Sequence, residues 1–411
     1  LNMCGICRVK LMDLCALQIL SPLPYQANRW RFVMKGSDCL QVQDILGKDL
    51  VGDEWLTEEE LRFLMSVTDE DELQLIYKKA YEVKAKYVKP VAYYRGLIEF
   101  SNRCIKNCNY CGIRRENDKA ERFDMNREDI IKMAQWAYDH EYGSITLQSG
   151  ERSDDIFVDY VVDLIREIKA IGDGSLGITM CVGEQSEEAY RHMREAGASR
   201  YLLRIETTNK ELYHKIHPQD ELHSFETRVE CLRRLRRVGF QVGTGVMIGL
   251  PGQTEEDLVN DILFYRDMDI DMIGMGPYVV HHDTPLGQEA LAMGIDDEAG
   301  KLRRVQLGLK MIALTRLFLK DVNIAATTAL QALDKLGREK GLAAGANILM
   351  PIITIPEHRA KYLLYDNKPC VDDNAEQCKD CLTRRVMSIG DTVGWNQNGD
   401  SKHYGKRTGK F

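Results

Sequence analysis

The chain has 411 residues, of which 44% are hydrophobic and 29% are charged, and this composition excludes a disordered or collagen-like protein. Its net charge of −8 and its pI near 5.7 argue against a nucleic-acid partner, and no apolar run reaches the ~18 residues of a membrane helix. A single α/β barrel of ~250 residues with extensions fits this length.

Half of the twelve cysteines fall into two tight groups. These groups are Cys104, Cys108 and Cys111, and Cys370, Cys378 and Cys381. The N-terminal residues lack the pattern of a secretory signal. Clustered thiols without such a signal predict metal binding in a reducing, cytoplasmic compartment.

The first 90 residues carry weaker signals. Residues 1–40 show little periodicity, and we interpret them as an uncertain segment, in which a zinc pair at Cys4 and Cys7 is less favoured than non-native sequence. Residues 41–90 are predicted to form a helical lead-in, with a capping box from Thr57 to Glu60 and a second helix start at Thr68.

Strand-like and helical segments alternate from residue 91 to residue 350. The predicted strands are residues 91–100, 144–149, 177–182, 201–206, 241–249, 272–280, 323–327 and 347–350. Helices are predicted to start near Asn126, Asp155, Ser186, Ser224, Thr254, Asp296 and Thr328. Eight strands alternating with helices predict an α/β fold of the (β/α)8 TIM-barrel type, whose chemistry lies at the strand carboxyl ends. Residues 351–411 are predicted to be a cysteine-bearing extension with a mobile tail from Asn396.

The strongest motif follows the first predicted strand. Cys104, Cys108 and Cys111 have the spacing Cys-x3-Cys-x2-Cys, with Tyr110 before the third cysteine. Three thiolates on one loop can hold three irons of a 4Fe-4S cubane and leave the fourth open, whereas a structural zinc site needs a fourth protein ligand. S-adenosylmethionine can chelate that open iron, and one electron then releases a 5′-deoxyadenosyl radical. A zinc knuckle or unrelated thiols are the alternative.

The triplet and its surroundings resemble the radical S-adenosylmethionine superfamily and, within it, the HydE family of FeFe-hydrogenase maturases. Methylornithine synthase is the close relative of that family, and biotin synthase is more distant. The similarity covers residues 56–385 in order, in the segments Arg95-Gly-Leu-Ile-Glu-Phe-Ser-Asn, Tyr110-Cys-Gly-Ile-Arg-Arg-Glu-Asn, Leu147-Gln-Ser-Gly-Glu151, Arg200-Tyr-Leu-Leu-Arg204, Gly249-Leu-Pro-Gly-Gln-Thr254, His281-x-Asp-Thr-Pro-Leu286 and Ala326-Thr-Thr-Ala329.

The resemblance implies a binding site for S-adenosylmethionine. Gln148, Ser149 and Gly150 match the family's motif after the second strand, where small side chains let the cofactor ammonium group reach backbone carbonyl oxygens. Glu206 and Arg228 match the residues that hold its ribose or ammonium group and its carboxylate, since a guanidinium offers a planar fork. A salt bridge between Glu206 and Arg228 is the alternative.

Three more positions complete this comparison. Tyr110 would belong to the cofactor site, and Met247 would pass under the adenine, with a packed strand interior as the equal alternative for Met247. Ile205 stands where some relatives have a histidine, and this departure puts a proton or hydrogen-atom role there in doubt.

For the substrate, the resemblance implies a small cysteine-bound iron carbonyl-cyanide unit. A polar, cationic barrel interior would hold this unit, with Gln148 at its edge. The residues that would line the interior are Arg95, Thr179, Thr327, Thr328 and Tyr365. Buried hydroxyls and guanidinium groups need partners, which a bound anion or amino-acid group supplies. The alternative for Thr327 and Thr328 is that they cap the helix after the seventh strand.

The second triplet, Cys370-x7-Cys378-x2-Cys381, matches the auxiliary iron-sulfur site of some family members. Zinc is the alternative, and either metal needs a ligand from outside the triplet. We interpret His281 and His282 as structural or rim residues, with a ligand role as the alternative.

The family resemblance implies partner hydrogenase maturases, reduced ferredoxin or flavodoxin as the electron donor, and a monomer. Two other functions are considered: a methylornithine synthase-like mutase, and an iron-sulfur scaffold or carrier without turnover. A carrier has no use for Glu206 and Arg228 at the ends of barrel strands.

Overall fold

The computed structural model describes residues 40–410, and three helices precede its barrel. They are α1 (Val42–Gly47), α2 (Glu58–Ser66) and α3 (Glu70–Tyr87). The predicted capping box is confirmed, because the Thr57 hydroxyl accepts from the Glu60 amide and the Glu60 carboxylate accepts from the Thr57 amide. The next helix starts one residue later than predicted, since the Asp69 carboxylate, and not Thr68, caps α3.

Within the described residues, eight parallel strands form the barrel in the order β10-β1-β2-β3-β4-β5-β7-β9. Their bounds are β1 (Val91–Ser101), β2 (Ser144–Ser149), β3 (Gly177–Cys181), β4 (Arg200–Leu202), β5 (Gln241–Thr244), β7 (Met272–Ile273), β9 (Asn323–Ile324) and β10 (Ile348–Leu349). The two ends of this order meet, because the Ala326 amide donates to the Ile348 carbonyl and the Asn347 amide donates to the Ile324 carbonyl. The predicted α/β barrel is therefore confirmed.

The fifth and sixth predicted strands are each interrupted once. Their outer parts, β6 (Met247–Ile248) and β8 (Gly276–Pro277), pair with each other in a small second sheet. At the interruption the two chains approach closely, since a Cβ on Gly245 would lie 2.2 Å from the Gly274 carbonyl oxygen. This outer pair extends the barrel wall beyond the carboxyl ends of β5 and β7.

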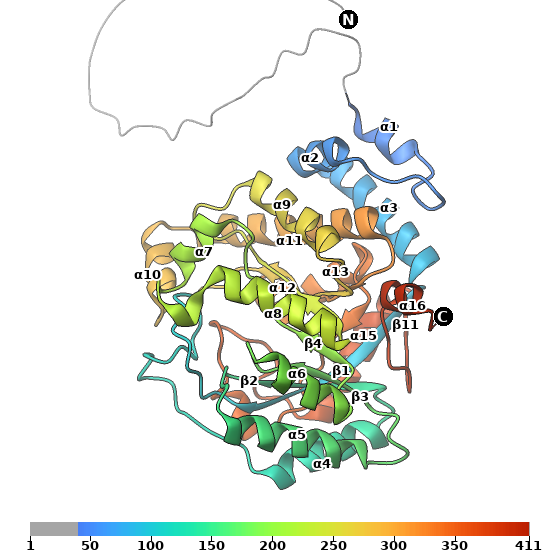
Figure 1. The fold of residues 1–411 in the computed structure, drawn as a ribbon. Coiled ribbons are helices and arrows are strands. Elements are labelled where there is room, and N and C mark those ends of the chain that lie inside the picture. The colour runs from blue at the N-terminus through green and yellow to red at the C-terminus, as the bar shows by residue number, and fades with distance from the viewer. Residues whose placement is uncertain (1–39, 411) are drawn as a thin grey trace, which may run out of the picture. The chain divides into compact units, whose positions relative to one another are not determined.

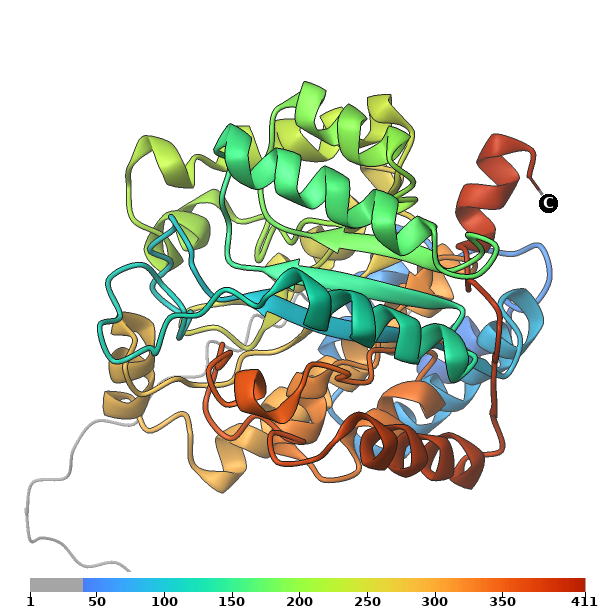
Figure 2. The ribbon, with the colours of Figure 1, turned by 90° about the horizontal axis from the view of Figure 1, so that it is seen from below.

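Helices surround the strands (Figures 1 and 2). α5 covers the barrel with an apolar stripe, in which Phe157, Val161 and Ile165 recur at helical spacing and are buried. The helices after β1 are α4 (Arg127–Asp139), α5 (Asp155–Lys169), α6 (Glu187–Glu195), α7 (Lys210–Ile216), α8 (Phe225–Val238), α9 (Glu255–Asp267), α10 (Pro285–Ala292), α11 (Glu298–Leu319), α12 (Thr328–Leu333) and α13 (Gly337–Ala343), with a 3-10 turn at Glu221–His223. No helix among residues 40–410 combines the length and the apolar character needed to cross a membrane.

The C-terminal extension contains α14 (Pro356–Arg359), α15 (Ala375–Ser388), β11 (Thr392–Val393) and α16 (Lys402–Thr408). The prediction of a mobile tail from Asn396 is wrong. β11 adds to the beginning of β1, and the chain then passes over the amino ends of the strands, where the Asp400 carboxylate lies 2.5 Å from the buried guanidinium of Arg200.

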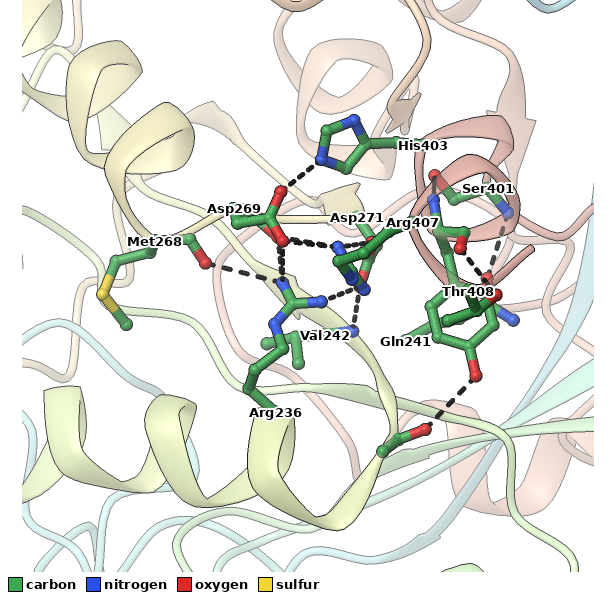
Figure 3. Close-up of polar contacts among 12 residues, drawn as sticks. Arg236, Gln241, Val242, Met268, Asp269, Asp271, Ser401, His403, Arg407 and Thr408 are labelled. Atoms are coloured by element: carbon green, nitrogen blue, oxygen red, sulfur yellow. Dashed lines mark hydrogen bonds and ion pairs between the residues drawn. The ribbon is translucent and has the colours of Figure 1, made fainter. Parts of the chain in front are cut away.

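Charged contacts hold α16 to the barrel (Figure 3). Arg407 lies 2.7 Å from the Asp269 carboxylate and 2.9 Å from that of Asp271, while Arg236 also contacts Asp271 at 3.0 Å. His403 lies between two carboxylates, 2.6 Å from Asp269 and 3.1 Å from Asp321. Lysine and glycine in this tail suggested mobility, whereas paired charges dock it onto the end of the barrel opposite the strand carboxyl termini.

Candidate functional site

The loop that carries the first cysteine triplet follows β1 and spans residues 102–123; we call it the cluster loop. The guanidinium of Arg122 holds it by donating to the carbonyl oxygens of Asn102, Ile113, Arg114, Arg115 and Asn117. The Asn117 side chain donates to the Gly112 carbonyl at 2.7 Å. A loop with this many internal bonds is ordered by its own chain and can present its thiols in a fixed arrangement.

Cys104, Cys108 and Cys111 project from the cluster loop as partly exposed free thiols. Burial raises the pKa of Cys108 to about 12, with the neighbouring Cys104 sulfur and the other charges acting less strongly. Burial also raises the pKa of Cys111, where Cys108 and Cys104 add to the effect. A bound cationic metal centre would deprotonate these thiols, because coordination stabilises the thiolate.

Lys106, between the first two cysteines, joins a buried charge network that sequence reasoning missed. Its ammonium group lies 3.1 Å from the Glu151 carboxylate and 2.9 Å from that of Glu184. Arg228 approaches the same two carboxylates, at 3.6 Å and 2.5 Å. The Glu151 amide also donates to the Cys104 sulfur at 3.3 Å. The network therefore connects the cluster loop with the ends of β2, β3 and α8.

The segment Gln148-Ser149-Gly150 lies at the carboxyl end of β2, beside the cluster loop. A Cβ on Gly150 would lie 2.3 Å from the Arg103 carbonyl oxygen and 2.9 Å from Cβ of Cys104, so only glycine fits there. Ser149 donates its hydroxyl to the Gly150 carbonyl at 2.7 Å. The close approach brings the backbone carbonyls after β2 next to the first cysteine.

Glu206 and Arg228 do not pair with each other, which removes the rim salt bridge considered above. Glu206 has a left-handed backbone with φ of 68°, and its carboxylate lies 2.9 Å from Arg204. Burial raises the pKa of Glu206, while Arg204 and then Arg228 lower it. Ile205, beside Glu206, is fully buried and carries no titratable group.

Met247 and Tyr110 belong to one apolar cluster at this end of the barrel. Met247 is buried with Leu212, Ile216 and Leu250, and Tyr110 packs against the same cluster. The Tyr110 hydroxyl also lies 3.4 Å from Nε2 of His217. Met247 therefore packs in the apolar interior beside the third cysteine, and its contact with the adenine stays a prediction.

Arg95 and Thr179 line the lower barrel interior, away from the cysteines. They border a small cavity inside the barrel together with Thr146. Arg95 donates to the Gly399 carbonyl of the C-terminal tail at 3.3 Å, but its Nε has no partner within residues 40–410. The hydroxyls of Thr146 and Thr179 are likewise buried without hydrogen-bond partners.

Thr327 and Thr328 lie near the upper end of the interior, after β9. Neither caps α12: Thr327 occupies the N-cap position without a side-chain bond, and Thr328 accepts from Arg338 at 2.8 Å. The Thr327 hydroxyl and two nitrogens of the buried Arg338 have no partner among the described residues. Burial raises the pKa of Tyr365, against the charge of the nearby Arg338. Arg338 is a second residue that the sequence interpretation missed.

The second cysteine triplet is brought together by the C-terminal extension. Cys370 lies in the loop before α15, while Cys378 and Cys381 lie one turn apart on that helix. A hydrogen bond from Cys370 lowers the pKa of Cys378 to about 6, so these two sulfurs are in contact. Arg385 donates to the Cys381 sulfur at 3.4 Å. The triplet thus forms a local thiol site.

Comparison with known proteins agrees with this geometry. Residues 98–265 match the model of the radical SAM superfamily. The chain is 41% identical over 344 residues to the [FeFe] hydrogenase maturase subunit HydE of Thermotoga maritima, covering 84% of this chain and 93% of that protein. The chain belongs to the HydE family. As a HydE-family member it is a radical SAM enzyme, and such enzymes use a 4Fe-4S cluster and S-adenosylmethionine.

HydE-family membership also fits the more remote similarities. A 3-methylornithine synthase of Methanosarcina acetivorans is 26% identical, covering 75% of this chain and 83% of that protein. The crystal structure of methylornithine synthase (PylB) has a TM-score of 0.71 at 24% identity, covering 85% of this chain and 98% of that chain. The maturase HydG from Carboxydothermus hydrogenoformans also reaches 0.71, at 17% identity, covering 88% of this chain and 81% of that chain. These two structures share the fold.

Proposed function

We propose that this protein matures FeFe-hydrogenase by acting on a small cysteine-bound iron carbonyl-cyanide precursor supplied by a partner maturase. The 41% identity to the Thermotoga maritima HydE supports this substrate class. The observation that carries the proposal is the set of buried polar atoms without partners inside the barrel, since such groups call for a polar ligand.

In this proposal Cys104, Cys108 and Cys111 hold the cluster, and S-adenosylmethionine binds its open iron. When bound, the cluster supplies the electron that cleaves the cofactor to a 5′-deoxyadenosyl radical. Gly150 supports the fit, because its missing side chain lets the cluster loop approach the end of β2 beside Cys104. The buried Glu206 would accept hydrogen bonds from the cofactor's ribose or ammonium group.

Arg228 would bind the cofactor carboxylate. Its guanidinium is buried and already faces Glu184 and Glu151, so these acidic partners orient the fork. Ser149, Tyr110 and Met247 would complete the cofactor site, with Met247 giving an apolar surface to the adenine. The charge network therefore links cofactor binding to the cluster loop through Glu151 and Lys106.

The upper interior supports a substrate site for an amino-acid group. Thr327 and Arg338 have unpaired polar atoms there, and Thr328 and Tyr365 lie beside Arg338. Gln148, which donates to the Tyr362 hydroxyl at 3.2 Å, would border the site. Arg95 and Thr179 border a small cavity in the barrel interior, so they would contact a small end of the substrate or an ordered water.

One observation supports the mutase alternative, namely the similarity of the fold to methylornithine synthase at a TM-score of 0.71. The lower sequence identity of 26% to such an enzyme favours the maturase. Partner maturases, reduced ferredoxin or flavodoxin as the electron donor, a monomeric state and an auxiliary iron-sulfur cluster at Cys370, Cys378 and Cys381 belong to the same proposal.

A cell-based test addresses the substrate class. A host that lacks this protein should make the hydrogenase polypeptide with its cubane cluster but without the organometallic subsite. Thr327→Val should reproduce that loss, because it removes substrate positioning, while the purified variant still cleaves S-adenosylmethionine. Full maturation by Thr327→Val would remove this residue from the site. Conversion of L-lysine to 3-methylornithine by the purified protein would establish the mutase instead.

A further inference from the structure

Three side chains of types that ligate metals lie close together behind the cluster loop, those of His281, His282 and Asp366. One ligand atom of each lies within 4.8 Å of the others. Asp366 Oδ1 lies 2.9 Å from Nδ1 of His282 and 3.9 Å from Nδ1 of His281. Two ligand atoms that each lie about 2.0 Å from a tetrahedral ion are roughly 3.3 Å apart. The two separations from Asp366 Oδ1, 2.9 Å and 3.9 Å, lie on either side of this value.

We propose that His281, His282 and Asp366 bind a divalent transition-metal ion of the zinc class. Two imidazole nitrogens and one carboxylate are a ligand set that zinc accepts, with a fourth position left for water. The His282 side chain is 60% exposed, which gives an ion access from solvent. His281 is buried, so the ion would sit at the boundary between the surface and the core.

The surroundings of His282 support this assignment. Its other ring nitrogen, Nε2, lies 3.1 Å from the Asp283 carboxylate, and Asp283 in turn pairs with Lys119. Metal-binding histidines usually donate their second nitrogen to a carboxylate in this way, which fixes the ring and its tautomer. The Asp283 amide donates to Nδ1 of His281 at 3.2 Å, so this nitrogen is unprotonated, and it would exchange that hydrogen bond for the ion.

The ligands also lie on a well-bonded scaffold. Thr284 donates its hydroxyl to the His281 carbonyl at 2.8 Å and caps α10. The amide of Asp366 donates to the Val280 carbonyl at 2.9 Å, and the amide of His282 donates to the Asp366 carboxylate at 2.9 Å. These bonds fix the ligand positions before an ion arrives, which lowers the entropy lost on binding.

The site adjoins the peptide after the third cluster cysteine. A Cβ on Gly112 would lie 2.4 Å from Nε2 of His281 and 2.2 Å from the Leu363 carbonyl oxygen, and the Gly112 amide donates to the Leu364 carbonyl at 3.0 Å. An ion held by His281 and Asp366 would therefore clamp the C-terminal extension against the cluster loop. Metal binding should raise the melting temperature of the protein for this reason.

The test counts zinc in the protein with its iron-sulfur clusters reconstituted. After equilibration with zinc and gel filtration, the unchanged protein should carry about one more zinc per chain than His282→Gln and Asp366→Asn. X-ray absorption of that additional zinc should show nitrogen and oxygen ligands at about 2.0–2.1 Å and no sulfur. Zinc should raise the melting temperature of the unchanged protein and of neither variant.

His403→Gln is the matched control, because His403 also lies between two carboxylates but has no second histidine beside it. This variant should keep the additional zinc. Equal zinc content in all four proteins, or sulfur ligands in the additional zinc, would overturn the proposal and leave His282 as a hydrogen-bonding partner of Asp366 and Asp283.

Discussion

The ammonium group of Lys106 lies 2.9 Å from the carboxylate of Glu184, although Lys106 stands between two cysteines and Glu184 follows β3. The contact is buried, with 4% and 11% of the two side chains exposed. It connects the conformation of the cluster loop to the strand ends that form the proposed cofactor site.

Lys106→Met should destabilise the cluster loop. It leaves Glu151 and Glu184 with Arg228 as their remaining cation, and breaking a buried ion pair costs about 3 kcal/mol. We expect a lower free energy of unfolding and less iron after reconstitution, measured by denaturant titration and iron analysis. Lys132→Met, which removes an exposed pair with Asp129, should change stability by less than about 1 kcal/mol. Normal stability and iron content in Lys106→Met would contradict the proposed connection.

Cys108→Ala should abolish cofactor cleavage. Two thiolates cannot hold a 4Fe-4S cluster that has three ligated irons and one open iron. The variant reduced with dithionite should therefore form no 5′-deoxyadenosine from S-adenosylmethionine. Chromatography of the reaction products measures this outcome. Cys231→Ala, which changes a buried thiol of α8, serves as the control and should keep cleavage. Unimpaired cleavage by Cys108→Ala would refute the assignment of the cluster.

Gly150→Ala should impair cluster binding. The added methyl group would meet the Arg103 carbonyl at 2.3 Å, so the cluster loop has to move away from β2. We expect at least a several-fold loss of the cluster's visible absorbance after reconstitution, with an unchanged far-ultraviolet circular dichroism spectrum. Gly47→Ala is the matched control, because nothing lies within 4 Å of its added Cβ. A fully loaded cluster in Gly150→Ala would show that the loop tolerates the shift.

The second triplet should be separable from catalysis, because it lies on α15 and the loop before it, after the eighth barrel strand. A protein with both Cys378→Ala and Cys381→Ala should lose part of its iron or zinc but keep cleavage of S-adenosylmethionine. Metal analysis and product analysis on the same samples decide the question. If cleavage fell in proportion to metal content in a folded protein, these cysteines would belong to the active site.

His403 should make stability depend on pH. Hydrogen bonds to Asp321 raise its pKa above 6.5 in the folded protein, with Asp269 adding to the effect. Its contribution is therefore fully present below pH 6.5 and is lost as the pH rises through the raised value. The melting temperature of the unchanged protein should fall toward that of His403→Gln between pH 6 and pH 9. A difference that stays constant over this range would exclude the contribution.

Local sequence patterns determined much of the fold and indicated the candidate cluster ligands. Strand and helix periodicity, with capping residues such as Thr57 and Thr254, predicted the barrel because these signals act within a few residues. The spacing of Cys104, Cys108 and Cys111 indicated a cluster for the same reason, since all its ligands lie on one loop. Where a single chain segment supplies the whole arrangement, its pattern is visible in the sequence.

Only the tertiary structure decided which charges meet. Lys106 and Glu184 are 78 positions apart, and His282 and Asp366 are 84 positions apart, so no local pattern indicates either pair. The tail from Asn396 has the composition of a mobile segment, yet Asp400 docks it onto the buried Arg200. Charged groups form such contacts only after the barrel has brought distant strand ends together and excluded water from them, which is why sequence alone could not predict them.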